Sequence, residues 1–598
     1  MSVICFLLFL LGFSLPAHSD EVLDAIEVTA EKDLSDFHLG SSEKLNPQSF
    51  ERQNSALLSE SLDDVSGVIS SQNGGPGSRV SYFIRGTEAR HVSFTIDSLK
   101  INDPSNTDRQ FDSAFLMTPF LKEVTLYKGP QAVLFGSDAM GGLIDMKSRK
   151  GENAPETRLS INAGSFGTLD SSLSKDWKKG DEHQGSLTWS SLRTDGISRL
   201  NQKRYGAKER DGAHITQLTS SSRHRWAKSW ESDFLISFLR GNNELDGVNE
   251  DNSQDAARSD QYLIQQKTNH ELSSNSAVTL RNGLSRHQRE IKTEASGRNS
   301  YESNLVQNEL TYIKENKHYQ FLLGLGHEQE EYLDSSLEKE ANLFSTFIQS
   351  AIKKDSLKFQ MGMRLENHSR YGGFQTGSAG VEYSFASQAL SLQYSQGYKA
   401  PSLYQLYGPD LFGQQIGYKD LVPERNHSWV GKWSYSLETL SIEASVFRNN
   451  LANLITFTNQ GFRNQNDFIS EGIEFALDGT LGSFRVRPSL THQSFRNTDG
   501  EILRRPNRQY NLKLAYFALE ALEFYSNIQF FSERTDISDN GNFVKLNEFE
   551  TVELGGRIEM GSSSYGILVK NVFDRNYEEV YGYSVMPRSV FLHYGKKF

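Results

Sequence analysis

The strongest constraint on this chain is an alternation of apolar and polar residues that runs from about residue 155 to the C-terminus. In one stretch Val381, Tyr383 and Phe385 share a parity, and Glu382 and Ser384 lie between them. A period of two places apolar side chains on one face of a strand and polar side chains on the other. Because a single packed core stops growing at about 250–300 residues, a soluble sandwich explains a pattern of roughly 440 residues poorly.

A closed transmembrane barrel accounts for both the pattern and the composition. Only 37% of the residues are hydrophobic, yet 11% are aromatic. Beyond the N-terminus no apolar run reaches the roughly 18 residues that a membrane helix needs. A barrel turns its apolar face to lipid, lines its lumen with the polar face and carries aromatic girdles at both interfaces. At roughly 20 residues per strand with its turn, residues 153–598 predict a mainly β fold of about 22 antiparallel strands. The wide lumen of such a barrel is normally plugged.

The N-terminal residues indicate export. Ile4–Leu15 is an apolar run too short to cross a bilayer, and the small residues Ala17 and Ser19 precede the expected cleavage point before Asp20. This arrangement is typical of a secretory signal peptide, which we expect at residues 1–19. The only cysteine, Cys5, lies within it, so the exported chain is expected to lack disulfides and thiol chemistry. The net charge of −12 disfavours a nucleic-acid partner.

Two further regions precede the predicted barrel. Residues 20–46 are acidic and polar with one apolar island, and we expect them to form an extended periplasmic arm. Residues 47–152 predict a compact α+β domain, with a helix at 59–65 and strands at 80–85, 93–97 and 123–127. We expect this domain to occupy the barrel lumen as a plug.

Short motifs resemble the TonB-dependent outer-membrane transporter family and follow one another in the family's order. One segment of the arm resembles the TonB box, and others resemble the plug's Arg-Gly motif, its later strands and landmarks of the barrel. The segments are Asp24–Ala30, Tyr82–Gly86, Phe94–Pro104, Leu121–Lys147, Tyr398–Leu403, Pro423–Glu424 and Asn571–Tyr577. Within the family the resemblance is closest to the cobalamin transporters, through Gln72–Gly77, Ala89–Val92, Phe135–Ala139 and Tyr577–Tyr583.

This resemblance implies active uptake of a scarce, large nutrient across the bacterial outer membrane, and no enzymatic activity. It implies a monomer that works with a TonB-type inner-membrane energy transducer and that the barrel-assembly machinery inserts among outer-membrane lipids. The expected ligand is cobalamin or a related corrinoid, and a ferric siderophore is the alternative. No covalent cofactor is expected. A secreted, soluble β-rich enzyme is the remote alternative.

Several residues are candidates for coupling. The resemblance implies that the TonB box pairs with the edge of a partner sheet through main-chain hydrogen bonds. Arg85 ends a plug strand, and its guanidinium is expected to bridge buried carboxylates on the barrel wall. Gly86, Gly129 and Gly136 are expected in turns or close contacts, and Pro130 ends the strand before it. The expected TonB-box residues are Asp24, Ala25, Ile26, Glu27, Val28, Thr29 and Ala30.

Two polar segments and the C-terminus supply the remaining candidates. Residues 102–112 are polar, contain a proline and follow a strand, which favours a substrate-binding plug loop. Residues 246–255 form an acidic loop whose oxygens suit Ca²⁺, although a solvated acidic loop is the simpler alternative. Phe598 closes an alternating terminal strand and resembles the assembly signal of outer-membrane barrels. The substrate candidates are Asn102, Asn106, Arg109 and Gln110, and the calcium candidates are Asp246, Glu250, Asp251 and Asp255.

Overall fold

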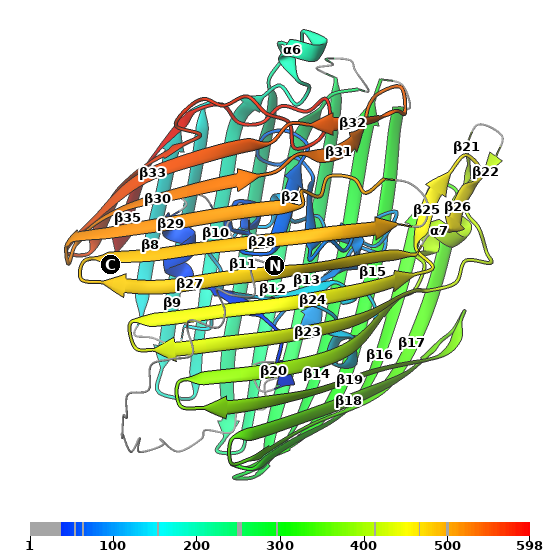
Figure 1. Ribbon diagram of the computed structural model, residues 1–598, viewed down its shortest axis with the longest axis vertical. Coiled ribbons are helices and arrows are strands. Elements are labelled where there is room, and N and C mark those ends of the chain that lie inside the picture. Colours follow the sequence, from blue (N-terminus) through cyan, green and yellow to red (C-terminus); the bar gives the residue numbers. More distant parts are fainter. Residues whose placement is uncertain are drawn as a thin grey trace, which may run out of the picture.

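The structure, a computed structural model, is a barrel of tilted strands that encloses a smaller N-terminal domain (Figure 1). The expected signal peptide, the expected TonB-box residues Asp24–Ala30 and Glu250 lie outside the described residues. Among the described residues, no helix combines the length and the apolar character needed to cross a bilayer. The described residues are 37–52, 56–62, 65–151, 155–247, 251, 254–294, 297–411, 414–465, 467–497 and 501–598.

Hydrogen bonds between neighbouring strands close the barrel into a continuous ring. Within the described ranges, twenty-two strands join in chain order, and the last one, β35, pairs antiparallel with the first, β8. The predicted 22-stranded antiparallel barrel is therefore confirmed. The barrel strands are β8 (Glu156–Gly164), β9 (Thr168–Lys179), β10 (His183–Ile197), β11 (Asp211–Ala227), β12 (Trp230–Leu245), β13 (Asp255–Ser273), β14 (Ser276–Thr293), β15 (Gly297–Glu315), β16 (Tyr319–Asp334), β17 (Glu338–Lys354), β18 (Leu357–His368), β19 (Gly372–Phe385), β20 (Gln388–Lys399), β23 (Glu424–Leu437), β24 (Leu440–Ala452), β27 (Phe468–Leu481), β28 (Phe484–Asn497), β29 (Arg508–Leu519), β30 (Leu522–Phe531), β33 (Phe549–Met560), β34 (Ser563–Lys570) and β35 (Ser589–Lys597).

The two faces of the barrel follow the alternation in the sequence. On β17, Phe344, Ile348 and Ile352 lie on the outer face and are 57%, 41% and 52% exposed. Phe347 and Gln349, at the intervening positions, lie on the inner face and are buried. Exposed large apolar side chains on the outside and mixed side chains inside are typical of a barrel surrounded by lipid.

A mixed sheet and a hairpin form the domain inside the lumen. The sheet has five strands in the order β1-β6-β7-β4-β5, with β4 and β7 parallel, and β2 pairs with β3 in the hairpin. The predicted strands at 80–85, 93–97 and 123–127 are confirmed as β3, β4 and β6, and the predicted helix at 59–65 overlaps α4. The elements of this plug are β1 (Ser42–Leu45), α3 (Pro47–Arg52), α4 (Leu58–Leu62), β2 (Val68–Gln72), β3 (Val80–Ile84), the 3-10 helix η1 (Ala89–His91), β4 (Val92–Ile96), β5 (Leu99–Lys100), the 3-10 helix η2 (Ser113–Phe115), β6 (Leu121–Lys128), α5 (Ala132–Phe135) and β7 (Gly142–Ser148).

The plug begins earlier than the sequence predicted. Ser42–Leu45 pairs with β6, with Ser42 opposite Tyr127, and the preceding Phe37 and Leu39 are buried. The boundary expected between residues 46 and 47 is therefore too late. It was misplaced because this four-residue strand carries a single apolar residue, so no alternation marks it.

The connections at the two ends of the barrel differ in length. At one end most turns have two or three residues, such as 228–229 and 355–356, whereas the other end carries long loops with elements of their own. Outer-membrane barrels have short periplasmic turns and long extracellular loops, so we assign the long-loop end, where α6 projects in Figure 1, to the outside. The loop elements are α6 (Gln202–Tyr205), α7 (Leu403–Tyr407), β21 (Asp410–Leu411), β22 (Gln414–Gln415), β25 (Ile455–Thr458), β26 (Gly461–Asn464), β31 (Arg534–Ile537) and β32 (Phe543–Leu546).

Candidate functional site

Arg85 follows β3, and its guanidinium reaches the barrel wall. Its Nη2 and Nε donate to the two carboxylate oxygens of Glu474 on β27, at 2.7 and 3.2 Å. Both side chains are buried, and the Lys128 Nζ lies 3.8 Å from the same carboxylate. The guanidinium also stacks over the Phe447 ring, 5.0 Å from its centroid. The expected contact between Arg85 and the wall is therefore present, although it involves one carboxylate rather than several.

Glycines allow the backbone of the plug to approach the wall closely. Gly86 has a φ of +73°, and a Cβ there would lie 2.3 Å from a ring carbon of Phe495. Gly136 has a φ of +69° where α5 ends, and a Cβ there would lie 2.8 Å from a carboxylate oxygen of the wall. Gly129 has a φ of +94°, and the buried Pro130 follows it just after β6. These positions match the turns and close contacts expected for them.

Glu424, the first residue of β23, forms hydrogen bonds with two side chains of the plug. Arg90 Nη2 donates to Glu424 Oε1 at 2.8 Å, and His91 Nε2 lies 3.0 Å from Glu424 Oε2. His91 Nδ1 accepts the backbone N–H of Glu88 at 3.1 Å, so Nε2 carries the ring proton and donates to the carboxylate. Burial lowers the pKa of His91 despite the adjacent carboxylate, which keeps the imidazole neutral at neutral pH. The sequence marked Pro423–Glu424 as a landmark but did not predict these partners.

Arg109, expected to contact the substrate, lies instead in a buried charge network. Its guanidinium donates to Asp138 of the plug and to Glu330 of β16, both at 2.8 Å. Lys399 of β20 donates to the same Asp138 at 2.6 Å. Although burial raises it, these two cations hold the pKa of Asp138 well below its usual range. A buried guanidinium needs charged partners, and Arg109 finds them within the protein.

The other three substrate candidates are also buried and bonded within the plug. Asn102 Oδ1 accepts the backbone N–H of Phe94 at 3.0 Å, and Asn106 Nδ2 donates to the Gln110 carbonyl at 3.1 Å. Gln110 Nε2 donates to the Val80 carbonyl at 3.2 Å. The polar side chains of residues 102–112 thus satisfy backbone groups of the plug.

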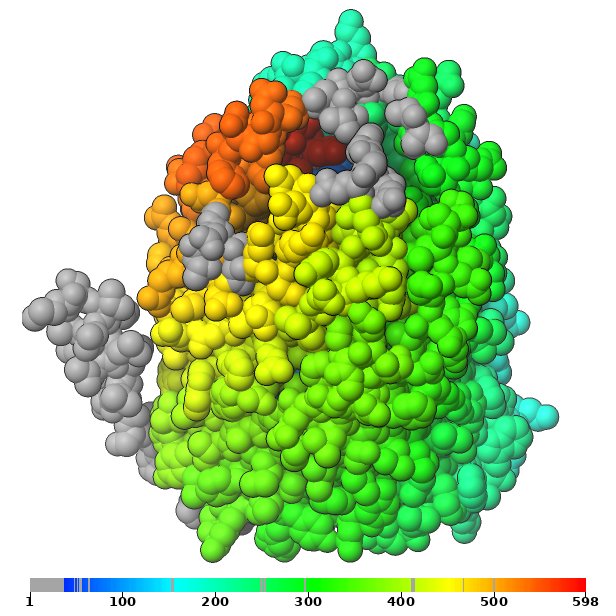
Figure 2. Space-filling view, turned by 90° about the vertical axis from the view of Figure 1, so that its right-hand side faces the viewer, coloured from blue at the N-terminus to red at the C-terminus, as the bar shows by residue number. Residues whose placement is uncertain are grey.

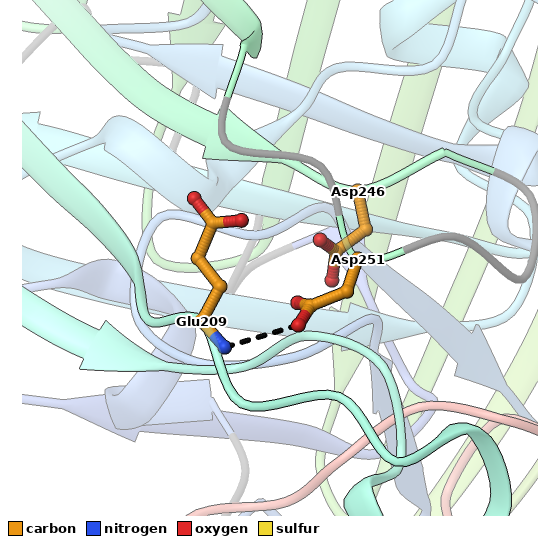
Figure 3. Close-up of side chains that lie close together, drawn as sticks. All are labelled: Glu209, Asp246 and Asp251. Carbon is orange, nitrogen blue, oxygen red and sulfur yellow. Dashed lines mark hydrogen bonds between the residues drawn. The ribbon is translucent and has the colours of Figure 1, made fainter.

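Carboxylates from two extracellular loops meet at the outer rim. One carboxylate oxygen from each of Glu209, Asp246 and Asp251 lies within 4.8 Å of the others (Figure 3). The backbone N–H of Glu209 donates to Asp251 at 3.2 Å, and that of Leu200 donates to Asp246 at 3.1 Å. Burial and the neighbouring carboxylates of Asp251 and Asp246 raise the pKa of Glu209. Three crowded oxygens of like charge form a donor set suited to a hard divalent cation.

This cluster includes only part of the predicted calcium set. Asp246 and Asp251 belong to it, whereas Asp255 accepts the backbone N–H of Glu294 at 2.8 Å and lies outside the cluster. The third carboxylate, from Glu209, was missed because it comes from the preceding loop and only the fold brings it close.

A cavity of about 760 Å³ opens at the extracellular rim. Most of the side chains that line it are polar or aromatic. The lining residues are Asn201, Lys203, Arg204, Phe530, residues 545–550, Arg575, Asn576, Tyr577, Glu578 and Tyr581. Arg204 Nη2 pairs with Glu578 at 2.9 Å, and its guanidinium lies 4.0 Å from the centroid of the Tyr581 ring. Figure 2 shows this end of the molecule hollowed between the orange and yellow loops. The volume falls within the ~300–1,000 Å³ typical of ligand pockets.

Two family profiles match the chain. A profile described as "TonB dependent receptor-like, beta-barrel" matches residues 156–572, and one described as "TonB-dependent Receptor Plug Domain" matches residues 38–143. The first match begins where β8 begins, and the second covers the enclosed domain from residue 38 to the start of β7.

The individual relatives are of two kinds, a vitamin B12 transporter and receptors for siderophores or ferric catecholates. The vitamin B12 transporter BtuB of Vibrio cholerae serotype O1 is 22% identical over 571 residues, which cover 93% of this chain and 92% of the relative. The siderophore receptor PirA from Acinetobacter baumannii superposes with a TM-score of 0.81 at 16% identity, covering 96% of this chain and 100% of PirA. The ferric-catecholate import receptor Fiu from E. coli K12, in its closed form, gives 0.80 at 14% identity, covering 96% and 99%. At such identities the superpositions establish the fold alone.

We expect Arg85→Ala to loosen the plug within the barrel, because it leaves the Glu474 carboxylate buried without its bidentate partner. Removing one partner of a buried ion pair typically costs about 3–5 kcal/mol. Hydrogen exchange of the β2 and β3 amides measures the free energy of local opening. Arg496→Ala, which removes an exposed pair with Glu471 on the same wall strand, is the control and should change exchange little. Equal protection in the two variants would contradict the anchoring role of Arg85.

Proposed function

Because this chain belongs to the TonB-dependent receptors, we propose that it takes up cobalamin or a related corrinoid across the bacterial outer membrane. The choice of ligand rests on one observation, the match to a vitamin B12 transporter along 93% of this chain and 92% of that relative. Such a match supports a common arrangement of plug, barrel and loops. The siderophore receptors share the fold, which serves both ligand classes, and a ferric siderophore is therefore the alternative ligand.

The rim cavity is the binding place that we propose for this ligand. A corrinoid carries amide side chains around a flat ring, and these need hydrogen-bonding partners as well as aromatic surface. Asn201, Lys203 and Arg204 supply polar groups to the cavity lining, and Tyr577 and Tyr581 supply aromatic rings. Asn102, Asn106, Arg109 and Gln110 are buried in the plug, whereas Lys203 and Arg204 are exposed on an extracellular loop.

We also propose that Ca²⁺ binds between Glu209, Asp246 and Asp251. Calcium takes about six to eight oxygen ligands, and three carboxylates supply part of that set. The bound ion would offset the repulsion between the three negative charges. The two loops that carry them are already joined by backbone hydrogen bonds to Asp246 and Asp251. A bound cation would therefore stiffen the loops beside the rim cavity, whose lining includes Asn201 and Arg204 from the first of them.

Energy coupling and assembly are assigned to the two ends of the chain. The proposed TonB box, Asp24–Ala30, pairs with the inner-membrane partner as an added strand. The proposed assembly signal is Phe598, whose side chain is 71% exposed beside the β35–β8 closure. Its backbone N–H donates to the Thr157 carbonyl at 2.9 Å, so the last residue takes part in closing the ring.

Direct binding tests the ligand. We expect purified protein to bind cyanocobalamin with a Kd of about 10⁻⁹ M and ferric enterobactin at least about a thousandfold more weakly. Isothermal titration calorimetry in detergent measures both. Tight binding of ferric enterobactin with none of cyanocobalamin would reverse the assignment.

Calcium binding is tested with a single carboxamide substitution. Asp246→Asn should weaken Ca²⁺ binding by about tenfold or more, because it removes one charge from the donor set. Calorimetric titration of Ca²⁺ measures the affinity. Asp181→Asn in a periplasmic turn, where the side chain is 85% exposed, is the control and should leave the affinity unchanged. If wild-type protein shows no Ca²⁺ binding, the acidic cluster is a solvated loop.

The coupling arm is tested with proline. Val28→Pro should abolish uptake of radiolabelled cyanocobalamin and leave its Kd unchanged, because proline removes a donor from the paired strand and does not touch the rim cavity. Leu34→Pro, between the proposed box and the plug, is the matched control and should still transport. Normal uptake by the Val28→Pro variant would exclude the proposed coupling role.

A further inference from the structure

Two histidines meet at the periplasmic end of the barrel wall, away from the plug and from the extracellular rim. His183 begins β10, His224 lies near the end of β11, and the register of the two strands places them directly opposite each other. Their Nδ1 atoms are 3.0 Å apart, and their ring centroids are 5.2 Å apart. Both residues are half-buried, so water still reaches the pair.

The pair lies on the outer face of the wall. Leu187 and Trp189 share the parity of His183 on β10, and Leu218 shares the parity of His224 on β11. All three of these apolar side chains are exposed, which marks this face as the one that meets lipid. Because the two histidines lie at strand ends beside the short turns at 180–182 and 228–229, they stand where the apolar band gives way to the periplasm.

Aromatic rings and a hydroxyl group hold the imidazoles in place. Trp226 stacks on His224, with centroids 5.5 Å apart and planes 26° from parallel, and the edge of Phe234 packs against His224 at 5.8 Å. Ser222 Oγ lies 3.0 Å from His224 Nε2. Side chains that are already fixed in this way lose little conformational entropy when they bind a ligand.

The contact between the two Nδ1 atoms places two lone pairs close together. A neutral imidazole carries one ring proton, so in this hydrogen bond one Nδ1 donates and the other accepts. If the donating ring carries its proton on Nε2 instead, both Nδ1 lone pairs point into the space between the rings, and no proton is released. Neutral imidazole nitrogens are the commonest metal ligands in proteins.

The distance between the two nitrogens matches the span of a chelated metal ion. Metal–imidazole bonds are about 2.0–2.1 Å long, so two bonds at about 90° span about 2.9 Å and two at about 109° span about 3.3 Å. The observed 3.0 Å is nearer to the right angle of a tetragonal complex, which Cu²⁺ favours, than to the tetrahedral angle of Zn²⁺. Cu²⁺ also has the highest affinity among the divalent metals of the first transition row.

We propose that His183 and His224 chelate Cu²⁺ through their Nδ1 atoms. Within the described ranges, three or more metal-ligating side chains gather only at the extracellular rim, so water completes the coordination of the ion at the histidine pair. The bound ion links β10 to β11 and stabilises the folded barrel by mass action. This metal site needs neither the plug nor the extracellular loops, and it does not rest on the proposed uptake function.

Copper binding to the purified protein in detergent tests the site. We expect copper sulfate, in a weakly coordinating buffer with excess Ca²⁺ to occupy the acidic rim cluster, to bind with a Kd of about 10⁻⁶ M. Zinc should bind at least about tenfold more weakly. Calorimetry measures both affinities, and electron paramagnetic resonance should show a tetragonal ion coupled to two nitrogens. A spectrum without nitrogen coupling, or tighter binding of zinc, would overturn the assignment.

Matched substitutions separate metal ligation from packing. His224→Phe removes both ring nitrogens but keeps an aromatic ring against Trp226, so it should weaken copper binding by about tenfold or more. His270→Phe is the control, because that ring also stacks on a tryptophan, Trp230, at 4.0 Å, and its Nδ1 donates to the Ser229 carbonyl. Heat-modifiable migration shows that each variant is folded. Equal affinities in the two variants would contradict the role of His224.

Tryptophan emission gives a second measurement of the same site. A bound Cu²⁺ quenches indole emission at short range, and Trp226 stacks directly on one of the proposed ligands. Quenching of wild-type protein should follow the calorimetric Kd, and His183→Ala should need about tenfold more copper or above. Unchanged quenching in that variant would overturn the proposal. Failure of the protein to bind cyanocobalamin would contradict the proposed ligand and leave the copper measurements valid.

Discussion

Backbone N–H and C=O groups inside hydrocarbon have no water to bond to, and the rest of this structure depends on how they are satisfied. Twenty-two described strands pair with their neighbours, and β35 pairs with β8, so no sheet edge faces lipid. A ring of that many strands encloses a lumen too wide for its own side chains to fill. The closure that solves the hydrogen-bonding problem therefore creates a second requirement, a folded domain inside the barrel.

The plug meets that requirement with charge as well as apolar packing. The inner face of a barrel is polar, so the surface that the plug contacts includes carboxylates such as Glu330, Glu424 and Glu474. Each of them is paired with an arginine of the plug, which specifies how the plug is oriented in the lumen.

Most of the fold was predictable, and most of the site was not. The strand number, the enclosed α+β domain and three of its strands followed from period-two alternation and turn signals, which are local in sequence. The contact of Arg85 with the wall was anticipated because a motif ends on it, but its partner Glu474 lies 389 residues away. Separations of 333 and 221 residues likewise hid the wall partners of His91 and Arg109. Glu209 was missed for the same reason, since its loop meets Asp246 only in the folded barrel.

The sequence by itself determined that this chain is a membrane barrel with a plug, because lipid and water impose an alternation that can be read one residue after another. The sequence also indicated the family, because short segments of plug and barrel follow one another in a recognisable order. The tertiary structure alone decided which charges are partners and which loops converge at the rim. Those properties depend on distances between residues that are hundreds of positions apart, and closing the ring sets those distances.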